Sequence, residues 1–385
     1  MSGDMGQAAL LGELRAKARA VGEATSARLE GLGEDDAART ALGALAVAGL
    51  ARWTIPQRDG GAEARGLCAT DDVSARAVCT LRDELAWHSA MLDVMLVMQG
   101  LCGYSVVRGG SVELRAEVLP ALANGTKIGA FALTEPGAGS SVDDVATRAE
   151  RAGAGWRITG HKTFISNAGI ADHYSVLART SGEPGARGGL TMFSVPAKSK
   201  GLTTERFEVI GPHPIGDVHF ADVEVADGRR LGEVGHGQDL ALATLGRFRT
   251  SVAACANGLA RRALDETKAH LAGRKQFGRP LAAFQALRFD VAEMDVRLRA
   301  AQLLTDEAAR AVDSGAPATA EVARAKLFAT EAAGWICDRA VQLHGGLGVK
   351  RGSVVERLYR DVRALRIYEG TSEIQKLVLA RELLG

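Results

Sequence analysis

The chain of 385 residues is 46% hydrophobic and 24% charged, with a formal net charge of +1. This composition is ordinary for a globular protein, and the length predicts two or three structural units. A net charge this close to zero, without a basic cluster, argues against nucleic acid as a partner. The five cysteines are far apart and form no C-x-x-C pair, which favours a reducing compartment over a disulfide framework or a zinc site.

No targeting or membrane signal is visible in the sequence. The first residues lack the basic and apolar regions of a secretory signal, and no apolar stretch approaches the ~18–20 residues that a membrane span needs. We therefore expect a cytoplasmic protein without a membrane partner.

Proline placement divides the chain into three regions. Residues 1–125 and 241–385 hold two prolines each, whereas 126–240 holds the other five. Because proline interrupts helices, we predict an N-terminal helical domain over 1–125, with a break near 56–61, and a C-terminal helical bundle over 241–385.

The middle region, 126–240, is predicted to be a β-domain. Several of its segments are rich in β-formers or partly alternate apolar and polar residues, which predicts strands. These segments are 156–160, 174–178, 190–195 and 218–225. A glycine-rich stretch, 181–189, predicts a loop between two of them.

The C-terminal region carries a helical apolar stripe. Its members follow one another at spacings of three and four residues, which is one face of a helix, and we expect core packing there rather than a cofactor site. The stripe comprises Phe284, Leu287, Val291, Met294, Leu298 and Ala301. Further helices are predicted near 240–272, 318–343, 354–365 and 372–384.

The motifs of several common enzyme classes are missing. Gly137-Ala138-Gly139 is followed by no third glycine of a dinucleotide fingerprint, and neither a phosphate-binding G-x-x-x-x-G-K-S/T nor a G-x-S-x-G nucleophile elbow occurs. The eight histidines include no H-E-x-x-H and no close ligand pair. The sequence therefore argues against a Rossmann dehydrogenase, a P-loop enzyme, an α/β-hydrolase and a zinc hydrolase, and we predict no metal ligand.

Five segments remain that could bind a ligand or carry chemistry. They are FALTEPGAGS at 131–140, KTFISNAG at 162–169, RKQFG at 274–278 with Phe284-Gln285 after it, QLHGGLG at 342–348 and IYEGTSEIQ at 367–375. Glycine lets backbone N–H groups approach a ligand oxygen, and arginine beside glycine-rich backbone suits a pyrophosphate. Each segment alone has a simpler reading as a turn, a strand end or a helix cap. Together and in this order they resemble the acyl-CoA dehydrogenases, over the chain from about residue 40 to its end.

The resemblance implies an α+β fold and FAD as the cofactor. The fold would have an N-terminal helical domain, a middle β-barrel or sandwich and a C-terminal four-helix-type bundle. Residues implied to line the flavin ring and the thioester arm are Phe131, Leu133, Thr134, Gly139, Ser140, Phe164 and Ser166. Residues implied to reach the pyrophosphate and adenine of a neighbouring subunit's FAD are Arg274, Phe277, Gln285, Gln342, Gly345 and Gly346.

The same resemblance assigns the remaining site residues and implies an oligomer, either a tetramer or a dimer. Thr371 and Glu373 match further FAD contacts. Ser140, Arg249 and Gly370 match substrate contacts.

Glu369 matches the catalytic base of the family. Removing the proton next to a thioester carbonyl needs a positioned base and stabilisation of the enolate. Burial raises the pKa of a carboxyl toward neutrality, whereas the positive end of the following helix opposes that rise. We expect Ser372 to cap this helix, with Gln375 completing a capping box. Some members carry the base on another helix, at a position that aligns with Phe248, which cannot act as one.

The expected reaction is FAD-dependent 2,3-dehydrogenation of an acyl-CoA to a 2-enoyl-CoA, with hydride transfer to flavin N5 and electron-transfer flavoprotein as the electron acceptor. An acyl-carrier-protein thioester dehydrogenase of a biosynthetic pathway is an alternative that the sequence does not separate from it. A flavin-dependent monooxygenase would not need a base at Glu369, so the intact YEGTSEI segment argues against this alternative. A nucleic-acid-associated flavoprotein is disfavoured by the near-neutral charge.

Overall fold

The computed structural model describes residues 2–69 and 71–385, and its contacts divide the chain into two compact units. The helical unit comprises the chain up to Ser26, Ala75–Asp93 and Arg249–Gly385. The β unit comprises Ala27–Ser74 and Val94–Phe248. The N-terminal helices are thus shared between the units, and the division into 1–125, 126–240 and 241–385 stays a prediction from chain order.

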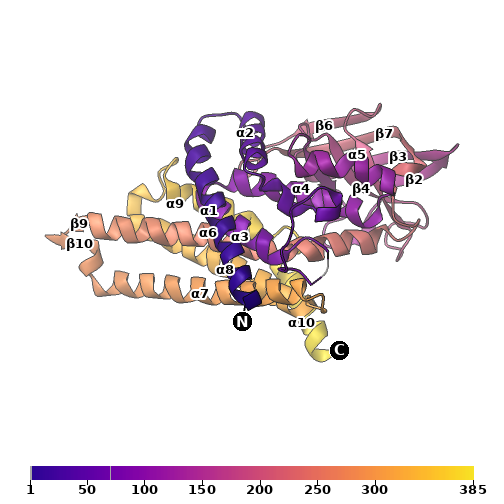
Figure 1. Cartoon of the computed structure of the whole chain (residues 1–385). Helices are drawn as coiled ribbons and strands as arrows, with labels where there is room; N and C mark the ends of the chain where they lie inside the picture. The colour runs from indigo at the N-terminus through magenta and orange to yellow at the C-terminus, as the bar shows by residue number, and fades with distance from the viewer. Residues whose placement is uncertain (1, 70) are drawn as a thin grey trace. The chain divides into compact units, whose positions relative to one another are not determined.

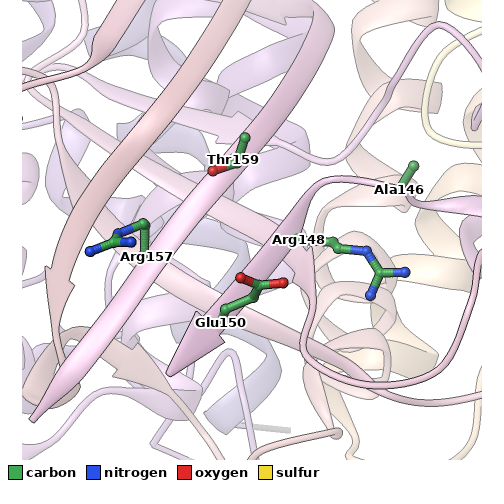
Figure 2. Close-up of a pocket in the computed structure, with 5 residues that line it drawn as sticks. All are labelled: Ala146, Arg148, Glu150, Arg157 and Thr159. Carbon is green, nitrogen blue, oxygen red and sulfur yellow. The ribbon is translucent and has the colours of Figure 1, made fainter. Parts of the chain in front are cut away.

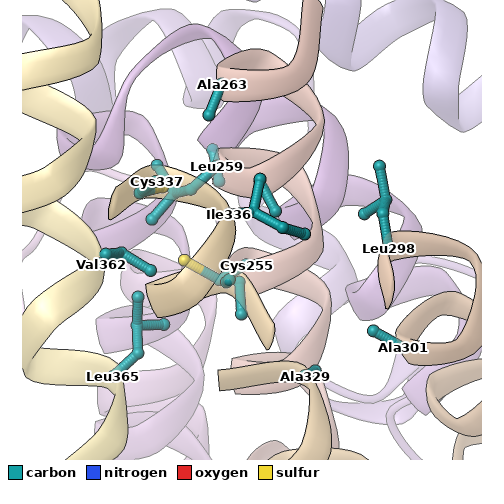
Figure 3. Close-up of a cluster of buried hydrophobic side chains, with 14 of the residues drawn as sticks. Cys255, Leu259, Ala263, Leu298, Ala301, Ala329, Ile336, Cys337, Val362 and Leu365 are labelled. Carbon is teal, nitrogen blue, oxygen red and sulfur yellow. The ribbon is translucent and has the colours of Figure 1, made fainter. Parts of the chain in front are cut away.

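The helical unit is built mainly from long helices. They are α1 (Ser2–Leu29), α3 (Ala75–His88), most of α6 (Gly237–Gly273), α7 (Gln285–Asp313), α8 (Thr319–His344), α9 (Val354–Arg363) and α10 (Ser372–Leu384). Figure 1 shows α7 and α8 running side by side. Their shared core with α6 and α9 is made of small and branched aliphatic side chains (Figure 3). The many alanines let these helices approach closely and pack at the density of a protein interior.

The four predicted C-terminal helices are confirmed as α6, α8, α9 and α10. The apolar stripe is confirmed as core over the middle of α7, where Met294, Leu298 and Ala301 are buried. At the start of α7 the stripe is less buried than predicted. Leu287 and Val291 are only partly buried, and Phe284 is the residue that precedes the helix.

The β unit combines one sheet with short helices. Its helices are α2 (Glu34–Val47), most of α4 (Ala90–Gly109) and α5 (Val112–Ala123). Its strands are β1 (Gly129–Ala132), β2 (Arg148–Ala152), β3 (Gly155–Ser166), β4 (His173–Arg179), β5 (Leu190–Pro196), β6 (Leu202–Arg206), β7 (Ile215–Ala226) and β8 (Arg230–Leu231). The predicted strands correspond to β3, β4, β5 and β7, and the 181–189 loop joins β4 to β5 as expected.

The sheet consists of two mainly antiparallel halves in the strand order β6-β7-β3-β2-β4-β5-β8, with β1 parallel to β4. The two halves meet where β2 and β4 pair, at the single residue pair Arg148 and Arg179. A sheet divided in this way fits the predicted β-barrel or sandwich, and it confirms the middle β-domain.

Helix α4 differs from the sequence-based expectation about membranes. It has 20 residues and enough apolar side chains to cross a bilayer by length and composition alone. However, 83% of its most apolar window is buried inside the protein. Such burial is typical of a core helix, so its apolar composition is explained by packing within the fold.

Candidate active site

Glu369 lies on a strained piece of backbone between two helical segments. The short helix η7 (Ala364–Arg366) precedes it and α10 follows it. Glu369 has a φ of +53° and Gly370 a φ of +93°, so two successive residues adopt the left-handed conformation. This is uncommon for a residue with a side chain and persists only where the surroundings hold it, which is typical of active sites.

Three side chains from three helices hold the carbonyl groups of this strained segment. Arg249 Nε of α6 donates to the Glu369 carbonyl at 2.8 Å, and Lys326 Nζ of α8 donates to the Gly370 carbonyl at 2.7 Å. Gln375 Nε2 of α10 also donates to the Gly370 carbonyl, at 3.1 Å. Arg249, predicted as a substrate contact, therefore has a structural partner in the backbone of Glu369 itself.

Lys326 is a site residue that sequence reasoning missed. Its side chain is fully buried, and burial lowers its pKa to about 8, against the opposing effect of Glu369. A signal was present in the sequence, since Lys326 falls on the apolar face of α8 between Val322 and Ala329. Lysine is rarely buried without a partner, so its place on that face pointed to a specific acceptor.

The carboxyl group of Glu369 is available for chemistry. The residue is half-buried, and its Oε2 atom is buried without a hydrogen-bond partner among the described residues. Burial raises its pKa, whereas the positive charges of Arg82, Arg249 and Lys326 lower it; the net direction is upward. Arg82 is itself held by Asp93, through two hydrogen bonds of 2.7 and 2.8 Å. The raised pKa agrees with the expectation for a general base.

The prediction that Ser372 caps α10 was wrong by one residue. The N-cap is Thr371, whose hydroxyl accepts from Ile374 N at 3.3 Å, and no capping box forms with Gln375. Thr371 follows the left-handed Gly370 and has a φ of −58° and a ψ of 165°, which is a non-helical conformation, as an N-cap requires.

The Ser372 hydroxyl instead forms a hydrogen bond with the carboxylate of Glu331 on α8. Ser372 Oγ donates to Glu331 at 2.6 Å, and Arg366 Nη1 donates to it at 2.9 Å. The Glu331 carboxylate therefore holds the chain on both sides of Glu369, at Arg366 and at Ser372.

A buried ion pair in the β unit joins the two segments that the resemblance assigns to the flavin ring. Lys162 Nζ of β3 bonds to Glu135 at 2.7 Å and to the Leu133 carbonyl at 2.8 Å. Glu135 also accepts from the backbone N–H groups of Ala146 and Thr147. Burial lowers the pKa of Lys162 to about 8, against the charge of Glu135. Because this pair is buried and each member has more than one hydrogen bond, it fixes the 131–140 loop against β3.

The surface formed by these two segments is open and partly aromatic. Phe164 lies at a register shift between β3 and β7, has a φ of +54° and is 62% exposed. Its ring contacts Phe207 edge-on, with the centroids 5.2 Å apart. A Cβ added at Gly137 or Gly139 would meet no atom within 4 Å. Ser166 Oγ lies 3.1 Å from His213 Nε2. An exposed ring beside an open glycine loop fits a planar aromatic ligand.

The residues assigned to the pyrophosphate and adenine end gather at one end of the helical unit. Arg274 and Phe277 belong to an exposed hairpin of β9 (Lys275–Gln276) and β10 (Arg279–Pro280), on which Phe277 has a φ of +50° and is 92% exposed. Gln342, Gly345 and Gly346 lie at the end of α8. The stacked rings of His270 and His344, with centroids 4.3 Å apart, join the ends of α6 and α8 there.

This end is separate from Glu369 within one chain. Lys326 and Gln342 are sixteen residues apart on α8, which is about 24 Å at the rise of an α-helix. A groove of about 540 Å³ between α6 and α7, lined in part by Leu264, Lys268 and Arg288, lies near the exposed hairpin. A different pocket, of about 320 Å³, lies on β2 and β3 and contains none of the predicted site residues (Figure 2).

Known proteins match the chain along nearly its whole length. The profiles of the N-terminal, middle and C-terminal domains of acyl-CoA dehydrogenase match residues 7–126, 130–223 and 235–384. The 3-(aryl)acrylate reductase of Clostridium sporogenes is 40% identical over 314 residues, which cover 80% of this chain and 83% of the relative. The cyclohexane-1-carbonyl-CoA dehydrogenase of Geobacter metallireducens is 35% identical over 339 residues, or 87% of each chain.

A solved structure agrees with the sequence matches. The butyryl-CoA dehydrogenase of Megasphaera elsdenii superimposes with a TM-score of 0.89 at 31% identity, covering 97% of this chain and 98% of its own. Similarity of this extent in both sequence and fold leaves one assignment. The chain belongs to the acyl-CoA dehydrogenase family, whose members are oxidoreductases acting on CH–CH groups.

Proposed function

We propose that the protein is an FAD-dependent acyl-CoA dehydrogenase in which Glu369 removes the α-proton of the acyl thioester. The observation that carries this proposal is the buried Oε2 of Glu369, which has no hydrogen-bond partner among the described residues, on a backbone held by Arg249 and Lys326. A carboxylate oxygen that accepts no hydrogen bond keeps its basicity, and a strained, anchored backbone fixes its direction.

The residues present fit FAD. Phe164 and the open glycine loop at 137–139 would hold the flavin ring in the proposed complex, with Thr134 and Ser166 as hydrogen-bonding groups at its edge. When bound, FAD supplies the acceptor for the hydride that leaves the β-carbon. Lys162 and Glu135 keep the 131–140 loop in place. Their proposed role is therefore to position the loop that binds the flavin.

The chain's own part in the reaction is the handling of the α-proton. Its transfer to Glu369 Oε2 leaves the negative charge on the thioester oxygen as an enolate. The carboxyl group then becomes neutral, which its buried surroundings favour. Arg249 and Lys326 contribute positive charge close to the carboxylate before the transfer and hold the peptide in the same geometry afterwards.

Assembly and electron transfer complete the proposal. In a tetramer or dimer, Arg274, Phe277 and Gln285 would reach the FAD of a neighbouring subunit, which accounts for their exposure in one chain. Gln342, Gly345 and Gly346 would act with them. Electron-transfer flavoprotein would then reoxidise the flavin in the cytoplasm.

A second candidate is the reverse reaction, reduction of a 2-enoyl substrate. The observation in its favour is the 40% identity to a relative named as a reductase. Glu369 would then donate the α-proton, since one residue serves both directions of a reversible step. An acyl-carrier-protein thioester is the corresponding alternative for the carrier.

The test is anaerobic bleaching of the bound flavin by a panel of saturated acyl-CoA and acyl-carrier-protein thioesters. We expect bleaching by acyl-CoA in the wild type, a loss of about 10²–10⁴-fold in Glu369→Gln and no loss in Glu382→Gln, an exposed carboxylate on α10. Bleaching in Glu369→Gln at the wild-type rate would assign the base elsewhere. Reoxidation of reduced flavin by enoyl thioesters, without bleaching by saturated ones, would establish the reductase. Turnover of carrier-protein thioesters alone would show that the substrate is carried by acyl-carrier protein and not by CoA.

A further inference from the structure

Two strands of the β unit bring three side chains of metal-ligating types to one face of the sheet, and none of the three residues is assigned to FAD. In the antiparallel pair of β3 and β7, His161 stands directly opposite His219. Asp217 lies two residues before His219 on β7, and side chains two apart on a strand point to the same face. The sequence search for closely spaced ligands missed this group, because its third member comes from another strand 56 residues away.

The donor atoms of the three side chains lie close enough together to share one metal ion. The two imidazole rings are stacked, with centroids 4.3 Å apart and 25° between their planes. His161 Nε2 lies 3.2 Å from Asp217 Oδ2. One donor atom from each of the three residues lies within 4.8 Å of the other two. Zn²⁺ bonds of about 2.0 Å place tetrahedral ligand atoms about 3.3 Å apart, so small rotations about the side-chain bonds are enough to close the set.

Two polar atoms of this group are buried without a hydrogen-bond partner among the described residues. They are His161 Nε2 and Asp217 Oδ1. The contact between His161 and Asp217 has the distance of an ion pair without the geometry of a hydrogen bond. Buried polar atoms in this state cost free energy, and a cation bound between them would remove that cost.

We propose that His161, Asp217 and His219 form a binding site for one divalent transition-metal ion. Imidazole nitrogens with one carboxylate suit Zn²⁺, Co²⁺ and Ni²⁺ better than Mg²⁺ or Ca²⁺, which prefer oxygen ligands throughout. All three residues are partly exposed, so water can complete the coordination. The site does not depend on the reaction proposed above.

Metal binding at this place would fasten β3 to β7. β3 continues from His161 to Phe164 and Ser166, next to a register shift of the pair. A ligand that binds the folded chain alone stabilises it by mass action, so we expect the metal to raise the thermal stability of the holoenzyme.

The test is a calorimetric titration of tag-free, EDTA-treated holoenzyme with Zn²⁺. We expect one site per chain with a Kd below about 10 µM, and a melting temperature that rises by about 2 °C or more in excess Zn²⁺. The affinity should fall at least tenfold in His161→Gln and in His219→Gln, and also in Asp217→Asn. His236→Gln is the matched control, because His236 is exposed, its Nδ1 lies 3.7 Å from Asp239 Oδ2, and no third ligand joins them among the residues that the structure describes. This variant should bind Zn²⁺ as the wild type does.

Two results would overturn the proposal. One is the absence of a site tighter than about 0.1 mM in folded, FAD-loaded wild type. The other is a site of unchanged affinity in both histidine variants, which would assign the metal to other groups. Circular dichroism and the flavin absorbance of each variant show that it is folded, so a loss of binding is then specific to the removed ligand.

Discussion

At the scale of single residues, the pKa of Glu369 decides when the proposed base is active. Burial raises this pKa above that of an ordinary carboxyl group. Only the carboxylate removes a proton, so the rate of flavin reduction should rise as the pH increases through the raised pKa. The free energy of unfolding changes in the opposite direction with pH. Because the folded chain holds its proton more tightly than the unfolded chain, ionisation of Glu369 lowers the free energy of unfolding over the same pH range.

Lys326 should control the position of that pH dependence. Its positive charge lowers the pKa of Glu369, so Lys326→Met should move the acidic limb of flavin reduction to higher pH. A shift of one pH unit would slow the reaction about tenfold on the acidic limb. The measurement is the anaerobic rate of flavin reduction between pH 5 and 9. Lys376→Met removes an exposed lysine on α10 and should leave the profile in place.

The same variant has an independent signature in stability. Burial lowers the pKa of Lys326 to about 8, so in the wild type the folded chain loses this proton before the unfolded chain does. Stability therefore gains a contribution as the pH rises from about 8 toward the ordinary lysine pKa. Lys326→Met should lack this gain in denaturant titrations. A variant whose rate and stability both follow the wild type at every pH would remove Lys326 from the site.

At the scale of elements, the start of α10 fixes the strained segment that carries Glu369. Thr371 caps the helix through Ile374 N, and loss of an N-cap costs about 1 kcal/mol. Thr371→Ala should therefore lower the free energy of unfolding by about that amount and slow flavin reduction, because Glu369 and Gly370 precede the cap. Thr371→Ser keeps the hydroxyl and should restore both quantities.

The two variants also separate the cap from the FAD contact that the resemblance assigns to Thr371. If Thr371→Ala loses FAD without losing stability, contact with the cofactor outweighs the cap. If flavin reduction is as slow in Thr371→Ser as in Thr371→Ala, the Thr371 hydroxyl does not determine the rate. The measurements are denaturant unfolding, FAD affinity and single-turnover flavin reduction for each variant.

Elements with a clear apolar pattern could be predicted from the sequence, whereas exposed ones could not. β5 is buried along nearly its whole length, and α7 has a continuous apolar stripe. β2 and β6 carry charged and polar residues and are mostly exposed or half-buried, so no apolar alternation marks them. The strand pattern thus predicted the core of the β unit and missed strands with polar, partly exposed faces.

The site was predictable to the extent that its motifs lie in continuous segments. Glu369 and the 131–140 loop are contained in such segments. The apolar face of α8 could mark Lys326 as a buried lysine, but the partners of Lys326 and Glu331 lie about forty positions away and are not contained in any local pattern. His161 and His219 are joined only by strand register. The sequence therefore predicted the proposed base, and the structure was needed for the residues that hold it.

At the scale of the whole molecule, α7 has a second apolar face that one chain leaves open. Phe289, Val296 and Leu303 are 64%, 63% and 55% exposed and follow one another at intervals of seven residues. At 100° per residue, this face is turned about 180° from the core stripe that contains Met294 and Leu298. A helix that is apolar on opposite faces is expected where both faces are covered, so we expect a second copy of the chain to pack here.

Val296→Glu tests this expectation. In an isolated chain the new carboxylate would be solvated and should change stability by less than about 0.5 kcal/mol, whereas burial in an interface would cost several kcal/mol. Light scattering after gel filtration should show the wild type as an oligomer and the variant at a lower mass. The variant should also retain FAD less well, since Arg274 and Phe277 are proposed to reach a neighbour's cofactor. Val112→Glu, at a 76% exposed position on α5, should keep both mass and FAD. A monomeric wild type that binds FAD fully would contradict the interface and the shared cofactor site together.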